Sequence, residues 1–433
     1  MINSLFRSNE NNFISLIYYN LLFYFQPASA QIDSSLLNTP AKKDTAKHTL
    51  SMDAIYNRPF KKLGSSSLSI GGYVESDVQY TNTSGITNGD QFQFRRFSLF
   101  VSSTIAPHIK FLSEIEYEDD PSGDAGEAAG PEFGVEYAAL DIEFNPLLNL
   151  RGGMILNPIG GFNENHDGPK YEFTDRPIAM TQMLPDTWNN PGFGLYGKKY
   201  SGHWMYGYEA YVTGGFNDSI INNSQGKTFL PAAKSSITRF NTSASGEPLY
   251  TGKLSFGNDQ IGELGLSYMG GVYNTWRVEG AQVDNKRSVN VFDVNFNGTI
   301  PGLHTNIISE WAWVFVDIPP DYTPEYAHKQ FGGFIDIVQP IIHGRILDWD
   351  NATVNIAVRG EYVDWNDGVF AATGQKMYND LWSIMPAISF RPTPQTVLRL
   401  NYRRQTQNDI TGNKIGAAIG PTAGLSFGIS TYF

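Results

Sequence analysis

The residues of this chain that could do chemistry are its histidines, carboxylates and arginines, because its 433 residues include no cysteine. The absence of cysteine excludes a thiolate zinc site, an iron–sulfur cluster and a cysteine nucleophile. The seven histidines lack the paired spacing with carboxylates that binds a metal ion. The sequence has no P-loop motif, and its one G-x-S-x-G match (Gly424–Gly428) and one G-x-G-x-x-G match (Gly192–Gly197) lie within extended runs instead of at a strand-to-helix turn. We therefore expect no catalytic residue, no metal site and no cofactor.

A second kind of chemistry, the sorting of charged solutes, is suggested by charges that recur in phase with small or polar residues. On a face toward lipid, each charge would cost about 2–4 kcal/mol near the bilayer midplane, so we place them on a water-filled inner face. Rings or ladders of such charges set ion preference in pores. The candidates in extended segments are Arg96, Lys110, Glu114, Glu116, Arg359, Glu361, Arg399 and Arg403.

Residues 157–191 form a long connection of mixed charge with no regular pattern. Five carboxylates and two cations give this segment a net charge of −3. Long connections of this kind in a compact barrel are usually functional, and the Phe, Met and Trp content favours packing inside another structure over a disordered surface loop. The candidates for contact with a solute are Asn163, Glu164, His166, Asp167, Lys170 and Arg176.

The elements that would position these residues are extended runs with a period of two. There are sixteen such runs, the first of which begins at Leu68. Each has close to the about 9–11 residues that a tilted membrane strand needs. No segment predicts an amphipathic helix of more than a few turns. The expected strands are residues 68–80, 91–104, 108–118, 132–144, 147–156, 192–200, 203–213, 248–257, 261–273, 287–299, 304–316, 325–338, 352–363, 379–391, 395–406 and 422–433.

The connections between these runs alternate between long and short. Long polar connections follow the first, third and later odd-numbered runs, whereas tight turns such as Asn145-Pro146 and Ser201-Gly202 follow the even-numbered ones. The gap at 339–351 is the exception. Outer-membrane barrels have long loops outside and short turns in the periplasm, and an even number of strands. The pattern predicts an all-β fold, a 16-stranded antiparallel transmembrane β-barrel.

The N-terminus and the composition bear on the compartment. Residues 1–30 have a basic start, a short apolar core and an Ala28-Ser29-Ala30 cleavage site, which predicts a signal peptide. We expect residues 31–66 to be a polar periplasmic lead-in and residues 67–433 to be the barrel, with 157–191 as the pore-constricting loop. A net charge of −12 without basic runs argues against nucleic-acid binding. A mean hydropathy of −0.29 without a long apolar run argues against membrane-spanning helices.

Several motifs resemble those of the phosphate-selective porins O and P. The resemblance is carried by Phe92-Gln93-Phe94-Arg95-Arg96-Phe97-Ser98-Leu99, Phe111–Tyr117, Arg151-Gly152-Gly153-Met154, Asn157-Pro158-Ile159-Gly160-Gly161 and the terminal Tyr432-Phe433. It implies a trimer whose third loop narrows the pore. It also implies that Phe433 is the signal read by the barrel-assembly machinery. Members that select phosphate line the constriction with Lys and Arg, whereas here the loop is net acidic.

The sequence thus predicts a passive diffusion channel in the outer membrane of a Gram-negative bacterium. The expected partners are outer-membrane lipid and lipopolysaccharide, the barrel-assembly machinery, ions or small polar solutes, and two further copies in a homotrimer. The resemblance suggests anion or phosphate preference. The acidic loop instead predicts weak cation preference or none, because charges within the Debye length of about 8 Å matter most.

Three alternatives stay open at this point. The first is a barrel for specific uptake of a hydrophobic or sugar solute, which would need an N-terminal plug. The second is an outer-membrane hydrolase, which would need a serine within reach of His203 or His304. The third is a soluble β-rich carbohydrate-binding protein, which the terminal Phe and the alternation of loops disfavour.

Overall fold

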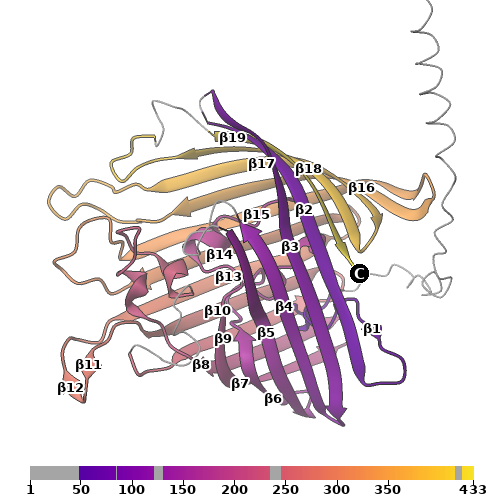
Figure 1. Ribbon diagram of the computed structural model, residues 1–433, viewed down its shortest axis with the longest axis horizontal. Helices are drawn as coiled ribbons and strands as arrows, with labels where there is room; N and C mark the ends of the chain where they lie inside the picture. Colours follow the sequence, from indigo (N-terminus) through magenta and orange to yellow (C-terminus); the bar gives the residue numbers. More distant parts are fainter. Residues whose placement is uncertain (1–47, 84, 121–129, 235–244, 415–421) are drawn as a thin grey trace, which may run out of the picture. The chain divides into compact units, whose positions relative to one another are not determined.

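The computed structural model describes residues 48–83, 85–120, 130–234, 245–414 and 422–433, so the expected signal peptide lies outside the described residues. Sixteen long strands among these residues form one closed antiparallel barrel, which confirms the expected fold class. Each strand pairs with the next in sequence, and β19 pairs with β2 to close the ring, as Figure 1 shows where the yellow strand lies beside the indigo one. None of the helices among the described residues is long and apolar enough to cross a membrane.

The strands follow the period-two runs of the sequence. Two short elements outside the sixteen long strands are β1 (Lys61–Lys62), which pairs with β2, and the hairpin of β11 (Arg277–Val278) and β12 (Ala281–Gln282). The long strands are β2 (Leu68–Thr83), β3 (Ile86–Ala106), β4 (Ile109–Asp120), β5 (Gly130–Asn145), β6 (Leu148–Leu156), β7 (Asn189–Ser201), β8 (Trp204–Thr213), β9 (Leu249–Asn258), β10 (Gly262–Val272), β13 (Ser288–Ile300), β14 (Thr305–Val316), β15 (Lys329–Ile346), β16 (Trp349–Asp364), β17 (Asp380–Thr393), β18 (Thr396–Gln407) and β19 (Thr422–Tyr432).

Alternation along each strand separates an outer from an inner face. In β19, Leu425 and Phe427 are 49% and 47% exposed, whereas Ser426 and Ser430 between and beyond them are buried. Successive side chains of a strand point to opposite faces, so large apolar side chains cover the outside and small or polar ones face the interior. The inner face is therefore where the charged candidates lie.

The sequence analysis treats residues 339–351 as a long connection that breaks the alternation. This is wrong, because the stretch consists of two strand ends joined by a tight turn. β15 continues to Ile346 and β16 begins at Trp349, with register shifts at Pro340/Ile342 and Gly344/Ile346. Each bulge adds an unpaired residue, which breaks the period of two in the sequence while pairing continues. Leu347 takes a left-handed φ of 53° in the turn. The alternation of long and short connections thus holds here as well.

The connection between β6 and β7 folds into the barrel interior. This interior loop (residues 157–188) contains η3 (Gly168–Lys170) and η4 (Ala179–Met183), and most of its residues are buried. Residues 214–234, with η5 (Asp218–Ile220) and η6 (Leu230–Ala233), pack beside it. Together with the inner wall they form an apolar cluster that includes Ile178, Met180, Met183, Leu184, Trp188, Phe216, Ile220, Leu230, Val291, Val314, Phe334 and Val363.

A second segment also contacts the inner face. This interior N-terminal segment (residues 48–60) includes η2 (Ser51–Asp53). Leu50 and Met52 pack on Tyr196 and Met205, which face the interior from β7 and β8. Ile55 packs on inward-facing residues of β4, β5 and β6. The segment thus begins beside a short turn, where the amide of His48 donates to the carbonyl of Asp259, and runs along the wall to Leu156, where β6 enters the interior loop.

Candidate functional site

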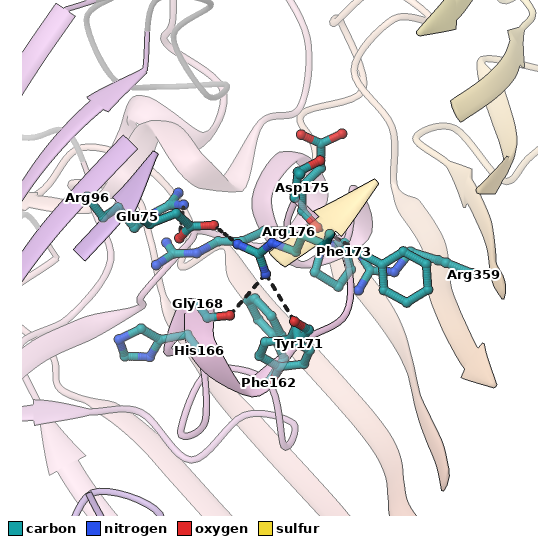
Figure 2. A pocket seen from close by; sticks show the side chains of 13 residues that line it. Glu75, Arg96, Phe162, His166, Gly168, Tyr171, Phe173, Asp175, Arg176 and Arg359 are labelled. Carbon is teal, nitrogen blue, oxygen red and sulfur yellow. Dashed lines mark hydrogen bonds and ion pairs between the residues drawn. The ribbon is translucent and has the colours of Figure 1, made fainter. Parts of the chain in front are cut away.

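A small cavity lies between the interior loop and the wall formed by β2, β3, β16 and β18. Four arginines line it, together with the carboxylates of Glu75 and Asp175. Figure 2 shows Arg96, Arg176 and Arg359 around this space, from two strands and the loop. The fourth arginine is Arg399 of β18. Because three of these arginines belong to separate strands, the barrel wall determines their spacing.

Arg399 and Arg359 attach the interior loop to the wall. Arg399 donates hydrogen bonds to the carbonyls of Gly168 at 3.0 Å and Tyr171 at 3.1 Å, and it also pairs with Glu75. Arg359 makes a bidentate pair with Asp336, with both distances at 2.7 Å. It also donates to the carbonyl of Asp175 at 2.7 Å. Both arginine side chains are fully buried, so the loop is fixed by directional, charge-assisted bonds.

Arg96 and Arg176 share carboxylates on the other side of the cavity. Arg96 lies 3.5 Å from Glu75 and 3.8 Å from Glu116, and Arg176 lies 3.7 Å from Glu116. Both arginines also interact with Glu118 of β4 and with Asp186 of the interior loop. The result is a continuous network of opposite charges from β2, β3, β4 and the loop.

The carboxylates of the interior loop all have cationic partners. Asp175, for example, accepts from Arg95 at 3.0 Å and lies 3.4 Å from Arg403. Each negative charge of the loop thus has a cation beside it, and some of these cations, such as Arg58 and Arg95, are shared with carboxylates of the wall. The five carboxylates and their partners are Glu164 with Lys253, Asp167 with Arg58 and Lys170, Glu172 with Arg391, Asp175 with Arg95 and Arg403, and Asp186 with Arg176.

Two candidates support the backbone of the loop. Asn163 donates to the carbonyls of Asn157 at 2.7 Å and Trp188 at 3.0 Å, and it accepts from the Trp188 amide, so it joins the two ends of the loop. Glu361 accepts from the amide of Ile178 at 2.9 Å and lies 3.6 Å from Arg403. Both contacts fix the path of the backbone.

Glu114, His166 and Asp167 form the one group among the described residues with the donor set and spacing of a metal site, with ligand atoms within 4.8 Å of one another. In the folded protein the guanidinium of Arg58 lies beside the two carboxylates, 2.6 Å from Asp167 and 2.8 Å from Glu114. Burial by itself would raise the pKa of Asp167, but Arg58 and Lys170 outweigh it and hold that pKa well below its usual range. An arginine thus supplies positive charge at this group.

The remaining candidates lie away from the cavity. Lys110 pairs with Glu143 at 2.7 Å beside the short turn between β3 and β4, and its side chain is 43% exposed. Phe433 follows β19, and its ring stacks on Phe97 with the centroids 5.8 Å apart. His203, one of the two histidines considered for a hydrolase, lies 2.9 Å from Asp259 at a short turn.

The sequence analysis missed Arg58, Arg95 and Arg391, although all three hold the interior loop. Arg58 lies in a segment read as polar, yet Leu50, Met52 and Ile55 within it are buried. These apolar residues in a lysine-rich stretch were the feature of the sequence that could have indicated a buried segment. Arg95 falls at a register shift of β3, so both Arg95 and Arg96 contact interior carboxylates.

Comparison with known proteins places the barrel within a structural class. No family model matches the chain, so the resemblance to the porins O and P rests on the motifs quoted above. An uncharacterized protein of Aquifex aeolicus (strain VF5) is 36% identical over 148 residues, 34% of this chain, and the match spans about a third (32%) of that relative.

Solved structures of outer-membrane porins and channels share the fold. Salmonella typhi OmpF, solved with daunomycin, matches with a TM-score of 0.52 at 10% identity, covering 86% of this chain and 100% of that one. The anion-selective porin from Comamonas acidovorans matches at 0.51 and 12%, covering 85% and 100%. The channel DcaP of Acinetobacter baumannii also matches at 0.51 and 12%, covering 87% and 100%. The chain therefore has a porin-type barrel fold.

Proposed function

We propose that this protein is an outer-membrane porin of a Gram-negative bacterium, through which ions and small polar solutes diffuse passively. One observation carries the proposal: a closed barrel with an apolar outside contains a loop that is buried inside it and is held between charged walls. Such a loop narrows the water-filled path, and the charges beside it act on whatever passes. The proposal requires no cofactor, energy source or catalytic residue.

The proposed sieve consists of the loop and the wall that faces the cavity. Size is limited by the backbone at Gly168–Tyr171, which Arg399 fixes. Charge is presented by Arg96, Arg176 and Glu116, whose side chains share partners and retain buried polar atoms without a hydrogen bond among the described residues. A passing solute can replace such incomplete contacts as it sheds water.

For charge selectivity, we propose a weak preference for cations or none. The pairing of the loop carboxylates removes much of the basis for a strong cation preference, and the resemblance to phosphate-selective porins points toward anions. Strong anion selectivity with a phosphate block would instead favour the phosphate preference that the resemblance to the porins O and P suggests. In that case Lys170→Ala or Arg176→Ala should abolish the block, because these are the two cations of the interior loop.

Assembly and export complete the proposal. A signal peptide at residues 1–30 would bring the chain to the periplasm, residues 31–66 would lead into the barrel, and Phe433 would be read by the barrel-assembly machinery. The barrel would lie in lipid and lipopolysaccharide as a homotrimer. Cross-linking of the protein in outer membranes tests the trimer, and N-terminal sequencing, expected to begin at Gln31, tests the export signal.

Liposome swelling tests passive diffusion. Proteoliposomes should swell in neutral polar solutes at rates that fall steeply with solute size and do not saturate with concentration. Arg399→Ala should raise the rates for the larger solutes, because the loop backbone loses its attachment at Gly168 and Tyr171. Arg345→Ala is the matched control, since it removes an arginine with a side chain 70% exposed at a short turn. Proteoliposomes that do not swell in any solute would overturn the proposal.

A further inference from the structure

The interior N-terminal segment is held along the wall by polar contacts at several points. The amide and hydroxyl of Ser51 donate to Glu263 of β10 at 2.6 and 2.7 Å. Asp53 accepts from Tyr200 of β7 at 2.6 Å, and the hydroxyl of Tyr56 accepts from Arg151 of β6 at 2.7 Å. Because the partners lie on different strands, the segment crosses part of the interior.

The last of these polar contacts, at Arg58, involves more partners than the others. Its Nε and Nη2 donate to the two oxygens of Asp167 at 2.9 and 2.6 Å, and Nη2 also lies 2.8 Å from Glu114. The guanidinium carbon lies 4.0 Å from the centre of the Phe100 ring. The side chains of Arg58, Asp167 and Glu114 are all 0% exposed.

The two carboxylates are oriented by groups other than Arg58. Asp167 accepts from the hydroxyl of Tyr432 at 2.7 Å, and Glu114 accepts from the hydroxyl of Ser98 at 2.6 Å. These contacts do not depend on the N-terminal segment. The carboxylates and the ring therefore form a site that is built by the barrel and the interior loop, into which the segment inserts one side chain.

The geometry of this site selects a guanidinium over an ammonium group. A planar guanidinium matches a carboxylate with two parallel N–H donors and stacks on an aromatic face, whereas an ammonium is a compact point charge without a plane. The contacts at Asp167 use the fork of donors, and the contact at Phe100 uses the plane. Both features are what a guanidinium-bearing ligand from solution would use.

We propose that Asp167, Glu114 and Phe100 form a guanidinium site in the lumen that the chain's own Arg58 fills. Residues 48–60 are then a tethered plug, and guanidinium-bearing solutes are the ligand class that takes the place of Arg58. The plug part of this inference rests on the proposed function, since it assumes a path through the barrel. Asp167 belongs to the interior loop and Glu114 to β4, so the occupant of the site also joins the loop to the wall.

Calorimetry on the folded protein in detergent tests the site independently of transport. Arg58→Ala should bind methylguanidinium at least about tenfold more tightly than the wild type, in which the site is filled. Methylammonium at the same ionic strength should bind Arg58→Ala at least about tenfold more weakly than methylguanidinium. Arg345→Ala, which removes an exposed arginine, should behave as the wild type. Equal binding to Arg58→Ala and the wild type, or equal binding of both cations, would overturn the inference.

Arg58→Lys keeps the experiment decisive if Arg58→Ala does not fold. This variant retains the charge but lacks the fork of donors and the plane. Methylguanidinium should compete with the lysine at a concentration at least about tenfold lower than with the wild-type arginine. If Arg58→Lys resists methylguanidinium as well as the wild type does, the site is not specific for guanidinium.

Conductance tests the plug. In planar bilayers, Arg58→Ala should pass more current per channel than the wild type, and methylguanidinium should raise the conductance of the wild type toward that of Arg58→Ala. Unchanged conductance in Arg58→Ala would overturn the plug. If neither protein conducts, the proposed function has failed, while calorimetry still decides whether the guanidinium site exists.

Discussion

The two halves of the interior loop differ in how many ion pairs hold them. The first half (residues 157–177) carries most of the charged residues, including Asp167 and Asp175, whose ion pairs attach it to the wall and to Arg58, while its Ile159 and Phe162 also belong to the apolar cluster. The second half (residues 178–188) carries Met183 and Trp188, which are buried in the apolar cluster. One ion pair, between Arg176 and Asp186, joins the two halves.

This difference explains where the cavity lies. An apolar segment gains by excluding space and water, so the second half packs closely against the wall and residues 214–234. Ion pairs instead have fixed lengths and directions, and the first half is lined by arginines that leave a small cavity beside it. We infer that the second half anchors the loop and that the first half meets the solute. The predictions below test this division.

The largest effect is expected from breaking the buried ion pair of the wall that holds the first half, because Arg359 also donates to the carbonyl of Asp175. Arg359→Met should destabilise the barrel by about 3–5 kcal/mol, because Asp336 is left as a buried charge without its partner. Urea unfolding of the protein in detergent measures this loss. The double variant Arg359→Met with Asp336→Leu should recover most of it, since no charge is then stranded. A double variant as unstable as the single one would contradict our account of this half.

Truncating a side chain in the second half should lower the free energy of unfolding by less than the loss of Arg359 does. The loss should depend only on the side-chain volume that is removed. Met183 is 1% exposed within the apolar cluster, so Met183→Ala should lower the free energy of unfolding by about 3 kcal/mol through lost burial and a cavity. Met183→Leu, with similar volume, should cost much less. Equal losses for the two variants in the same urea experiment would mean that close packing does not hold this half.

Acid should weaken the connection between the halves. Burial raises the pKa of Asp186, but Arg176 and Arg96 outweigh it and lower the pKa to about 2. A carboxyl whose pKa is lower in the folded state contributes stability above its unfolded pKa of about 3.9, and this contribution is lost as the pH falls toward 2. The wild type should therefore lose about 2 kcal/mol more than Asp186→Asn between pH 5 and pH 2. Parallel loss in both proteins would count against the contribution of this pair.

The smallest effect is expected at Lys110, which the sequence analysis placed in the pore. Its pair with Glu143 is partly exposed, so Lys110→Ala should change stability by less than about 1 kcal/mol. It should also leave the size limit in liposome swelling unchanged, because Lys110 does not line the cavity. A clear shift of that limit would extend the constriction to the short-turn end.

The sequence predicted the barrel because alternation and turn length are local properties. The β19 pattern at Leu425 and Phe427, for example, needs no knowledge of any partner strand. The role of Arg58 could not be predicted in this way, since it depends on Asp167, which is 109 positions away. The pairing of the loop carboxylates was missed for the same reason: a net charge in sequence omits partners such as Lys253 and Arg391 that the fold brings from distant strands.

Single-channel recording of the purified wild-type protein tests the central claim most directly. We expect stepwise conductance in planar bilayers, with a reversal potential close to zero in a salt gradient, because the charges beside the interior loop are largely paired. Heat-modifiable protein that inserts into the bilayer without any conductance steps would contradict the proposal that this barrel is a channel.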